Sequence, residues 1–498
     1  MVKQLFEEIK KGINLRDNLS RLRVAVKEDN NLNDLFELVE EDSKSLSCFL
    51  KNDDPKVRKN TALIMGALEM TDYLDCLVEA YKTEEQLFVR SAYLEALKNY
   101  EYSEYLPFIK EKVEKLMTIT LTDENKKHIS EELKGLTELI IKVEGITHHT
   151  FRGWKVEGNP LECILLTNKL CLDVTQKQLE YDDVEVIPYK AGVRIKTNNL
   201  RHIKNIRTYS DVLFVIPGFD TSDFDPVKVA EALAGSKLIN LLEKTHTGKV
   251  PFYFRIELKS NLDLEKKSKF TKRLAAELEF LSGRKLLNST SDYEIEIRLI
   301  ESRDGKINAL LKLYTIEDNR FAYFNKHVAA SIKPVNAALI AQLAKEYMRP
   351  DAQVIDPFCG VGTMLIERHK AVPANTMYGL DINAEAIQSA KENTELAGQI
   401  AHYINRDFFT FTHEYLFDEI ITDMPFSVND KNVSEIEGIY KKFFVQAKKV
   451  LKEQGTIIMF SRNPLFAEIY AKKSGLKIEK RYAMSPKDDV AVFVIKMK

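Results

Sequence analysis

The decapeptide EIITDMPFSV (419–428) sets an acid, a proline and an aromatic ring directly after a short apolar run. In this stretch Asp423 could accept hydrogen bonds or a proton, Pro425 fixes the backbone, and Phe426 could stack on a planar base. A strand that simply ends in a turn uses the same residue types. The stretch therefore indicates either a chemical site or a plain turn, and the other motifs of the chain have to decide between them.

A second candidate site lies in AQVIDPFCGVGTMLIERHK (352–370), which is predicted to form a buried strand, a tight turn and a helix. Gly360 and Gly362 allow the backbone to come close to a ligand at the start of that helix, where free N–H groups point outward. A nicotinamide site would need the pattern G-x-G-x-x-G. Because Thr363 and Met364 follow Gly362 and the third glycine is absent, the loop predicts a different cofactor.

These two motifs belong to a series of alternating strands and helices that fills the last third of the chain. Predicted strands end near Asp381 and Asp407, and the run FDEIITD forms another that ends at Asp423. Helices are predicted over 384–398 and 436–451. Such alternation is typical of a doubly wound parallel sheet, which binds its ligand at the carboxyl ends of the strands. We therefore expect the three acids at one edge of a sheet.

Both motifs resemble those of a known enzyme class. DPFCGVGT (356–363) closely resembles the first motif of class I S-adenosylmethionine-dependent methyltransferases, in the DPFCGSGT form of amino-methylating RNA enzymes. DMPF (423–426) resembles their (D/N)-P-P-(Y/F) signature for exocyclic amines. Residues 323–344, and more broadly residues 146–322, resemble the THUMP-containing RNA methyltransferases, in particular the subgroup that methylates N2 of guanine in the acceptor stem of tRNA.

The resemblance implies three domains. Residues 1–145 are expected to form an α-helical, HEAT-like repeat domain, and residues 146–322 an α+β region with ferredoxin-like and THUMP parts that binds RNA. Residues 323–498 are expected to form an α/β, Rossmann-like class I methyltransferase domain. The implied cofactor is S-adenosylmethionine, and the implied partner is structured RNA, in particular tRNA. The implied activity is a tRNA guanine-N2 methyltransferase.

The resemblance also assigns roles to residues that match the family's motifs. Asp356, Gly360 and Gly362 are expected to shape the methionine pocket, Asp381 to hold the ribose, and Asp407 the adenine amine. The full set implied to bind the cofactor is Asp356, Pro357, Phe358, Gly360, Gly362, Thr363, Asp381, Ile382, Asp407 and Phe408. Each of the acids has a plain alternative as a turn former at the end of a strand.

Asp423, Pro425 and Phe426 are the expected catalytic residues. An aromatic amine is a poor nucleophile because its lone pair is delocalised into the ring, so an acceptor such as Asp423 could draw the nitrogen toward a tetrahedral form and take its proton. Two residues depart from the family's pattern: Met424 stands where a first proline is usual, and Ser427 where a glycine is common. Both departures concern the base pocket.

The middle region combines short β-branched runs with one basic helix. A strand is predicted over 250–260, a helix over 263–283, and two further strands over 292–315 with a hairpin turn at Asp304-Gly305. The cations of this region are Arg255, Lys259, Lys266, Lys267, Lys269, Lys272 and Arg273. They form either a solvated helix face or an edge that contacts RNA phosphates.

The first 145 residues show helical spacing almost throughout. NDDPKVRKNTALIMGAL (52–68) reads as a helix that starts at Asp54-Pro55, and EEQLFVRSAYLEALKNY (84–100) repeats its Val-Arg pair 32 positions later. Matched units at this spacing suggest stacked helical hairpins, and the segment resembles HEAT-type repeats. Such an array either presents a face to a protein partner or serves as a packing appendage.

Composition limits the remaining function classes. The 498-residue chain has a formal net charge of −2, with a balance of −7 over residues 1–145 and +5 over residues 146–498, so a polyanion is expected to meet the later part. No apolar run approaches the roughly 20 residues that span a bilayer. The five cysteines form no CxxC pair and no zinc spacing. We therefore expect a cytoplasmic chain with neither metal nor membrane partner.

Two other functions are consistent with the same residues. One is an amino-methylase that acts on adenine N6 or on ribosomal RNA, because the pocket residues do not separate these acceptors. The other is a non-catalytic RNA-binding scaffold, in which Asp-Met-Pro-Phe-Ser marks a lost activity. Retention of both Asp356 and Asp381 argues against a scaffold, since a chain that binds no cofactor has no need of them.

Overall fold

The computed structural model describes residues 1–40, 42–119, 122, 124–145, 148–248, 250–328, 331–426, 433–487 and 489–497. The chain divides into two compact units. One comprises Met1–His148 with Ala276–Leu287, and the other His149–Ala275 with Asn288–Lys498.

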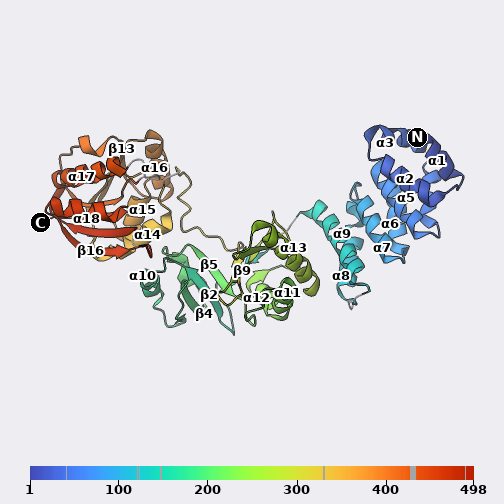
Figure 1. Cartoon of the computed structure of the whole chain (residues 1–498), viewed down its shortest axis with the longest axis horizontal. Helices are drawn as coiled ribbons and strands as arrows, with labels where there is room; N and C mark the ends of the chain where they lie inside the picture. The colour runs from blue at the N-terminus through green and yellow to red at the C-terminus, as the bar shows by residue number, and fades with distance from the viewer. Residues whose placement is uncertain are drawn as a thin grey trace. The chain divides into compact units, whose positions relative to one another are not determined.

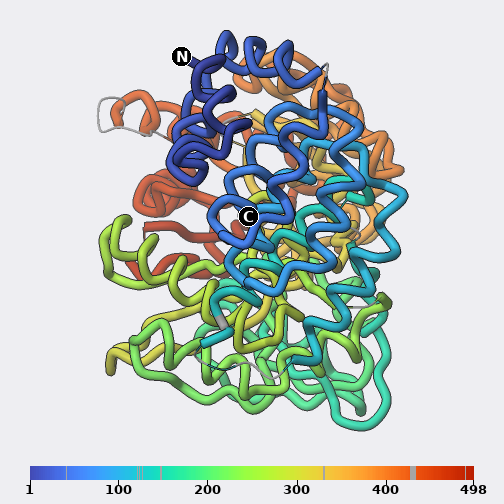
Figure 2. Tube along the Cα trace, turned by 90° about the vertical axis from the view of Figure 1, so that its right-hand side faces the viewer, coloured from blue at the N-terminus to red at the C-terminus, as the bar shows by residue number. Residues whose placement is uncertain are grey.

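The first unit is built from helices. Its elements are α1 (Val2–Lys10), α2 (Leu15–Ala25), α3 (Asp29–Glu40), α4 (Lys44–Ser47), η1 (Cys48–Lys51), α5 (Pro55–Leu68), α6 (Tyr73–Thr83), α7 (Leu87–Leu97), η2 (Ser103–Tyr105), α8 (Leu106–Met117) and α9 (Lys126–Glu144). Helices α5, α7 and α9 pack one after another, while α6 packs on α7 and α8 on α9 (Figures 1 and 2). The predicted start of α5 is confirmed: Asp54 caps it by accepting a hydrogen bond from Lys56 N, and Pro55 is its first residue.

The two matched sequence phrases make matching contacts. Arg58 forms an ion pair with the buried Glu84 at 2.7 Å, and Arg90 forms one with the buried Glu132 at 3.2 Å. Tyrosine hydroxyls donate to the same two carboxylates, from Tyr93 to Glu84 and from Tyr81 to Glu132. Each buried charge therefore has a cation and a hydroxyl as partners, which offsets the cost of removing it from water.

A glycine sets how closely α5 and α7 approach. A Cβ atom at Gly66 would lie 2.6 Å from Ala96 Cα, a distance that no side chain tolerates. The hydrophobic core between these helices is accordingly tight and includes Ile64 and Tyr93, both fully buried.

The second unit begins with a mixed sheet. Its strands are β2 (Leu161–Leu166), β3 (Val184–Ile187), β4 (Val193–Thr197), β5 (Asp211–Val215), β7 (Phe252–Lys259), β9 (Ile295–Glu301) and β10 (Ile307–Leu313), and a small pair is formed by β1 (Thr150–Phe151) and β6 (His246–Thr247). Strand β8 (Leu286–Asn288) crosses the boundary between the two units. The order β3-β4-β2-β5-β10-β9-β7 is antiparallel except for the parallel pair β7–β9. The predicted hairpin turn is confirmed: β9 and β10 pair antiparallel, and Gly305 has φ +77°.

The described residues of the same part of the chain form four α-helices and two 3-10 helices, and Figure 1 labels α10, α11, α12 and α13. They are α10 (Leu172–Gln176), η3 (Lys177–Leu179), η4 (Leu200–Asn205), α11 (Pro226–Gly235), α12 (Leu238–Thr245) and α13 (Leu264–Leu281). Helix α13 is the predicted basic helix, and its apolar side holds the buried Phe270, which stacks on Phe224 at 4.9 Å.

The last part of the chain forms a second, largely parallel sheet. Its strands are β11 (Gln353–Asp356), β12 (Thr376–Asp381), β13 (His402–Asn405), β14 (Phe417–Asp423), β15 (Leu451–Ser461), β16 (Lys477–Ala483) and β17 (Ala491–Lys496). They lie in the order β13-β12-β11-β14-β15-β17-β16. The predicted parallel arrangement is confirmed from β11 to β15, but β17 runs antiparallel between β15 and β16. The link between β16 and β17 is too short for the crossover that a parallel pair needs.

Helices cover both faces of this sheet. They are α14 (Pro334–Leu343), η5 (Lys345–Tyr347), α15 (Thr363–Ala371), α16 (Ala384–Leu396), η6 (Phe408–Thr410), α17 (Val433–Val450) and α18 (Pro464–Lys473). Successive strand residues enter different cores, as strand geometry requires. Ile420 packs with Phe443 of α17, whereas its neighbour Ile421 packs with Ile340 of α14 and Leu365 of α15.

Two adjacent buried charges fix helix α15. Arg368 is fully buried and forms two hydrogen bonds, of 2.9 and 2.8 Å, with Glu419 on β14. Glu367, 1% exposed, accepts from Arg207 at 2.8 and 2.6 Å and from the Tyr323 hydroxyl at 2.6 Å. Helix α15 is therefore tied both to the strand that ends in Asp423 and to the segment between η4 and β5.

Replacing Arg207 with alanine should lower the free energy of unfolding by about 3–5 kcal/mol, because the buried carboxylate of Glu367 loses its cation. Urea-induced unfolding of the full chain measures this. The control is Lys228→Ala, which removes the same charge from an exposed pair with Asp223 and should leave stability essentially unchanged. Equal stability of both variants would contradict a structural role for the buried pair.

Candidate functional site

A cavity of about 460 Å³ opens at the carboxyl ends of β11, β12 and β14. Almost all of the predicted catalytic and cofactor-binding residues line it. They are Asp356, Pro357, Phe358, Gly360, Thr363, Asp381, Ile382, Asp407, Phe408, Asp423, Pro425 and Phe426. The cofactor motif and the DMPF motif, 67 residues apart, thus share one cavity.

Gly362 is the one predicted cofactor residue that does not line the cavity. It has φ +84°, and a Cβ atom there would lie 2.4 Å from the hydroxyl of Tyr403, so its role is to let the loop pass this side chain. Gly360, with φ +49°, has open space where a Cβ would stand. Its N–H donates to Asp381 Oδ2 at 3.0 Å, which ties the loop to the end of β12.

Asp356 presents an unpartnered carboxylate oxygen in the cavity wall. The residue is 1% exposed, and Oδ1 accepts a hydrogen bond from Phe358 N at 3.1 Å, whereas Oδ2 has no partner. Burial raises the pKa of this carboxyl to about 8; the Thr422 hydroxyl and Phe358 N oppose this rise, and the nearby charges of Asp423 and Asp381 add to it. Thr363 Oγ1 is also buried without a partner. Buried polar atoms of this kind indicate a bound ligand that satisfies them.

The ends of β12 and β13 supply acceptors beside an apolar surface. Asp381 accepts from Asn383 N at 2.8 Å, and Asp407 accepts from Phe409 N at 2.8 Å. The apolar side chains of Ile382 and Phe408 line the same cavity: Ile382 is 78% exposed, and Phe408 is buried. Carboxylates with spare lone pairs next to an exposed apolar side chain suit the hydroxyls and the flat ring of a nucleoside.

Asp423 has a partner that the sequence analysis missed. Arg462, directly after β15, places Nη1 2.9 Å from Asp423 Oδ1 and Nη2 3.4 Å from Oδ2. Its guanidinium carbon lies 4.0 Å from the centre of the Phe426 ring. Burial raises the pKa of Asp423 to about 6, and Arg462 opposes this rise. The sequence signal is a cation at the end of the strand that neighbours β14, because parallel strands end at the same edge.

Met424 makes a hydrogen bond that the usual proline could not. Its N–H donates to Phe460 O at 2.9 Å, and the side chain is 1% exposed. This bond extends the pairing of β14 with β15 and fixes the position of Asp423. Ser427, the other departure, lies outside the described residues.

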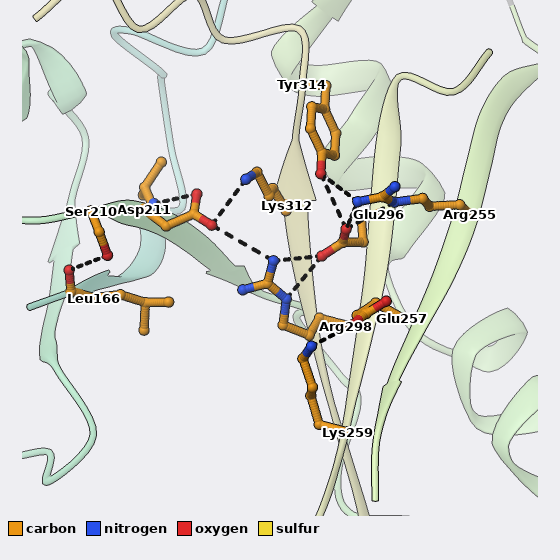
Figure 3. A network of polar contacts seen from close by, with 11 residues as sticks. Leu166, Ser210, Asp211, Arg255, Glu257, Lys259, Glu296, Arg298, Lys312 and Tyr314 are labelled. Carbon is orange, nitrogen blue, oxygen red and sulfur yellow. Dashed lines mark hydrogen bonds and ion pairs between the residues drawn. The ribbon is translucent and has the colours of Figure 1, made fainter. Parts of the chain in front are cut away.

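The predicted RNA-contacting cations differ in how they are paired. Figure 3 shows Arg255 on the sheet, where Nε donates to the buried Glu296 at 2.9 Å, and Lys259 in an ion pair with Glu257. On α13, Lys266 pairs with Asp263 at 3.2 Å and Lys269 with Glu265 at 2.6 Å. Lys272 and Arg273 are exposed, and neither they nor the partly exposed Lys267 form an ion pair within the described residues.

In the described part of the chain, no group of three or more His, Cys, Asp or Glu side chains is arranged to hold a metal ion. Among its helices, none combines the length and apolar character needed to cross a bilayer.

Replacing Met424 with proline should destabilise the chain by about 1–3 kcal/mol, because the buried carbonyl of Phe460 loses its donor. Thermal unfolding measures the change. Met424→Leu keeps the N–H and nearly the same volume and should cost less than about 1.5 kcal/mol. A proline variant as stable as the leucine variant would show that this hydrogen bond does not hold the end of β14.

Several curated proteins are similar to part of the chain. It is 28% identical over 134 residues to a tRNA (guanine(10)-N2)-dimethyltransferase of Methanothermobacter thermautotrophicus, which covers 26% of this chain and 39% of the relative. It is 28% identical over 139 residues to the bovine U6 snRNA (guanine-N(2))-methyltransferase THUMPD2. This match covers 26% of this chain and 25% of the relative. The putative RNA methyltransferase YpsC of Bacillus subtilis is 25% identical over 251 residues. This match covers 41% of this chain and 63% of the relative. The chain thus spans less than two thirds of each of these relatives.

Solved structures share the fold over a longer stretch. TrmN from Thermus thermophilus superposes with a TM-score of 0.51 and 18% identity, covering 68% of this chain and 100% of its own. SMU.472, a putative methyltransferase solved with SAH, superposes with a TM-score of 0.51 and 13% sequence identity. It covers 68% of this chain and 98% of its own. A family model, the RMKL-like methyltransferase domain, matches residues 323–489. Residues 323–489 of this chain are therefore similar to RMKL-like methyltransferase domains.

Proposed function

We propose that this chain transfers a methyl group from S-adenosylmethionine to an exocyclic amine of structured RNA, with N2 of guanine in tRNA as the acceptor. The observation that carries the proposal is the single cavity that brings Asp356 of the cofactor motif and Asp423 of the DMPF motif together. The guanine-N2 acceptor is supported by relatives whose names specify this chemistry.

The cavity residues fit this cofactor. The unpartnered Oδ2 of Asp356 suits the ammonium of the methionine part, and Asp381 suits the ribose hydroxyls. Ile382 and Phe408 offer apolar contacts to the adenine ring, and Asp407 an acceptor for its amine. When bound, the cofactor supplies a methyl group on a positively charged sulfur.

The residues of the DMPF motif would orient the acceptor base. Asp423, with its pKa near 6, is ionised at neutral pH and can accept the N–H bonds of the amine. Phe426 can stack on the base, a contact worth about 1–3 kcal/mol, and Pro425 fixes the turn between them. Correct alignment of nitrogen and methyl carbon supplies much of the rate, and Asp423 can take the proton that the nitrogen loses.

In this proposal, the middle region binds the RNA and the first region binds a protein partner. We assign residues 146–322 to the ferredoxin-like and THUMP region, where the exposed Lys272 and Arg273 and the partly exposed Lys267 of α13 are available to RNA phosphates. We assign residues 1–145 to a HEAT-like array, a surface for a protein partner. The stacked order of α5, α7 and α9 supports this assignment.

Replacing Asp423 with alanine should reduce methyl transfer to tRNA by at least about a hundredfold while leaving the affinity for S-adenosylmethionine nearly unchanged. Radiolabel transfer and isothermal titration calorimetry measure the two effects. Asp423→Asn separates the roles, because it keeps an acceptor and cannot take a proton. The control is Asp418→Asn, at the opposite end of the same strand. Near-normal turnover in Asp423→Ala would refute the assignment.

Nucleoside mass spectrometry of tRNA from a deletion strain identifies the product. We expect one N2-methylguanosine to disappear and to return with the wild-type gene but not with Asp423→Ala. If the modified nucleosides are unchanged and the purified chain binds no S-adenosylmethionine, the chain is a scaffold. Loss of a methylated adenine instead would establish the adenine alternative.

Binding of S-adenosylmethionine at pH 7 should release about one proton. The pKa of Asp356 is raised to about 8, so this carboxyl is mostly protonated at pH 7 and must ionise to pair with the ammonium. Calorimetry in buffers of different ionisation enthalpy counts the proton. Asp356→Asn should bind more weakly and release none. Proton uptake by the wild type, or the same release by the variant, would contradict the pairing.

The same carboxyl makes stability depend on pH. Its pKa in the folded chain lies above that of an exposed aspartate, so the folded state binds the proton more tightly. Without cofactor, this group's contribution to stability is present below pH 4 and is lost as the pH rises toward 8.

A further inference from the structure

The guanidinium of Arg462 has the contacts that a bound base would need. Its two outer nitrogens donate to the two oxygens of Asp423, at 2.9 and 3.4 Å. Its plane lies over the Phe426 ring at 4.0 Å, and the Phe460 ring is 5.0 Å away. The carboxylate and the ring that the proposed function assigns to the acceptor base are therefore both in contact with one side chain of the protein.

The chemistry of that side chain matches one nucleobase. In guanine, C2 is bonded to N1, N2 and N3, so the edge that carries the target amine is itself a guanidine unit with two parallel N–H donors. A carboxylate receives these two donors in the same fork that it forms with arginine. Adenine instead offers a donor at N6 beside an acceptor at N1, and this acceptor would face a carboxylate oxygen.

We infer that Arg462 is an internal stand-in for the acceptor base, which occupies Asp423 and Phe426 until a guanine displaces it. This inference rests on the proposed function. A base enters only if it replaces both hydrogen bonds, so the exchange selects guanine over adenine. Because a free nucleotide must compete with a tethered side chain, productive entry requires further contacts from the rest of the RNA.

Burial of the two groups is consistent with such an exchange. The Asp423 side chain is 13% exposed and the Arg462 side chain 28% exposed, so the arginine lies on the more open side of the pair. A lone carboxylate in this position is costly, since burial alone raises its pKa. Arg462 therefore keeps Asp423 ionised between turnovers.

The test compares nucleotide binding to the full-length wild type and to Arg462→Ala, by calorimetry with 5′-GMP and 5′-AMP. The variant should bind GMP at least about tenfold more tightly than the wild type, and its affinity for AMP should rise by a smaller factor, because AMP can stack on the freed Phe426 but cannot form the fork with Asp423. Arg406→Ala is the matched control, because Arg406 lines the same cavity without contacting Asp423; it should show no gain. An equal gain for AMP and GMP, or no gain for GMP, overturns the inference.

A chemical rescue makes the test independent of how well Arg462→Ala folds. Methylguanidinium chloride should raise the melting temperature of Arg462→Ala and not that of the wild type, because it refills the vacated place. Arg462→Lys keeps the charge and lacks the planar fork, so it should show a smaller gain for GMP. Absence of rescue together with unchanged GMP binding in both variants rejects the stand-in.

These outcomes separate the inference from the proposed function. If the wild type methylates guanine in RNA and Arg462→Ala binds GMP no better, only the stand-in fails. If Arg462→Ala prefers GMP and the wild type methylates no RNA, the base site is correct and the proposed reaction fails.

Discussion

Two neighbouring charges on helix α15, Glu367 and Arg368, hold the site together. Both are essentially buried, so each needs a partner of opposite sign. Arg368 finds Glu419 on β14, which sets the strand that ends in Asp423 against the helix that begins at the glycine loop. Glu367 finds Arg207 from the middle region. The distance between the two motifs is thereby fixed by ion pairs that tolerate little change in geometry.

Among the acids that line the cavity at this edge, Asp356 is buried, and Asp381 and Asp423 are partly exposed. Asp356, Asp381 and Asp423 end three adjacent strands, so their proximity follows from the parallel order of the sheet. Desolvation and mutual repulsion raise the pKa of Asp356. Such a site is electrostatically complementary to a ligand that carries positive charge, as a sulfonium with an ammonium group does. The same desolvated negative charge therefore favours binding of such a ligand and raises the pKa of the Asp356 carboxyl.

Much of this site could be predicted from local sequence. The strand–glycine–helix pattern around Gly360 and the acids at the strand ends depend on neighbours in the chain, and the structure has these residues around one cavity. Arg462 could not be predicted in this way. Its pairing with Asp423 depends on the register of β14 and β15, in which Asp423 lies opposite Phe460. Likewise the reason for Gly362, the hydroxyl of Tyr403, comes from a strand 41 residues away.

The predicted RNA-binding cations also show that a local sequence does not reveal partners on neighbouring strands. Their number in the sequence suggested a charged edge, but Arg255 is held by the buried Glu296, a partner that strand pairing supplies. The helical unit shows where sequence repetition is informative, because Arg58 and Arg90, 32 positions apart, each pair with a buried glutamate. In both pairs the glutamate lies further along the chain than its arginine, outside the helix that carries the arginine. Removal of an internal hairpin would therefore separate the partners and leave a buried charge without its counter-ion.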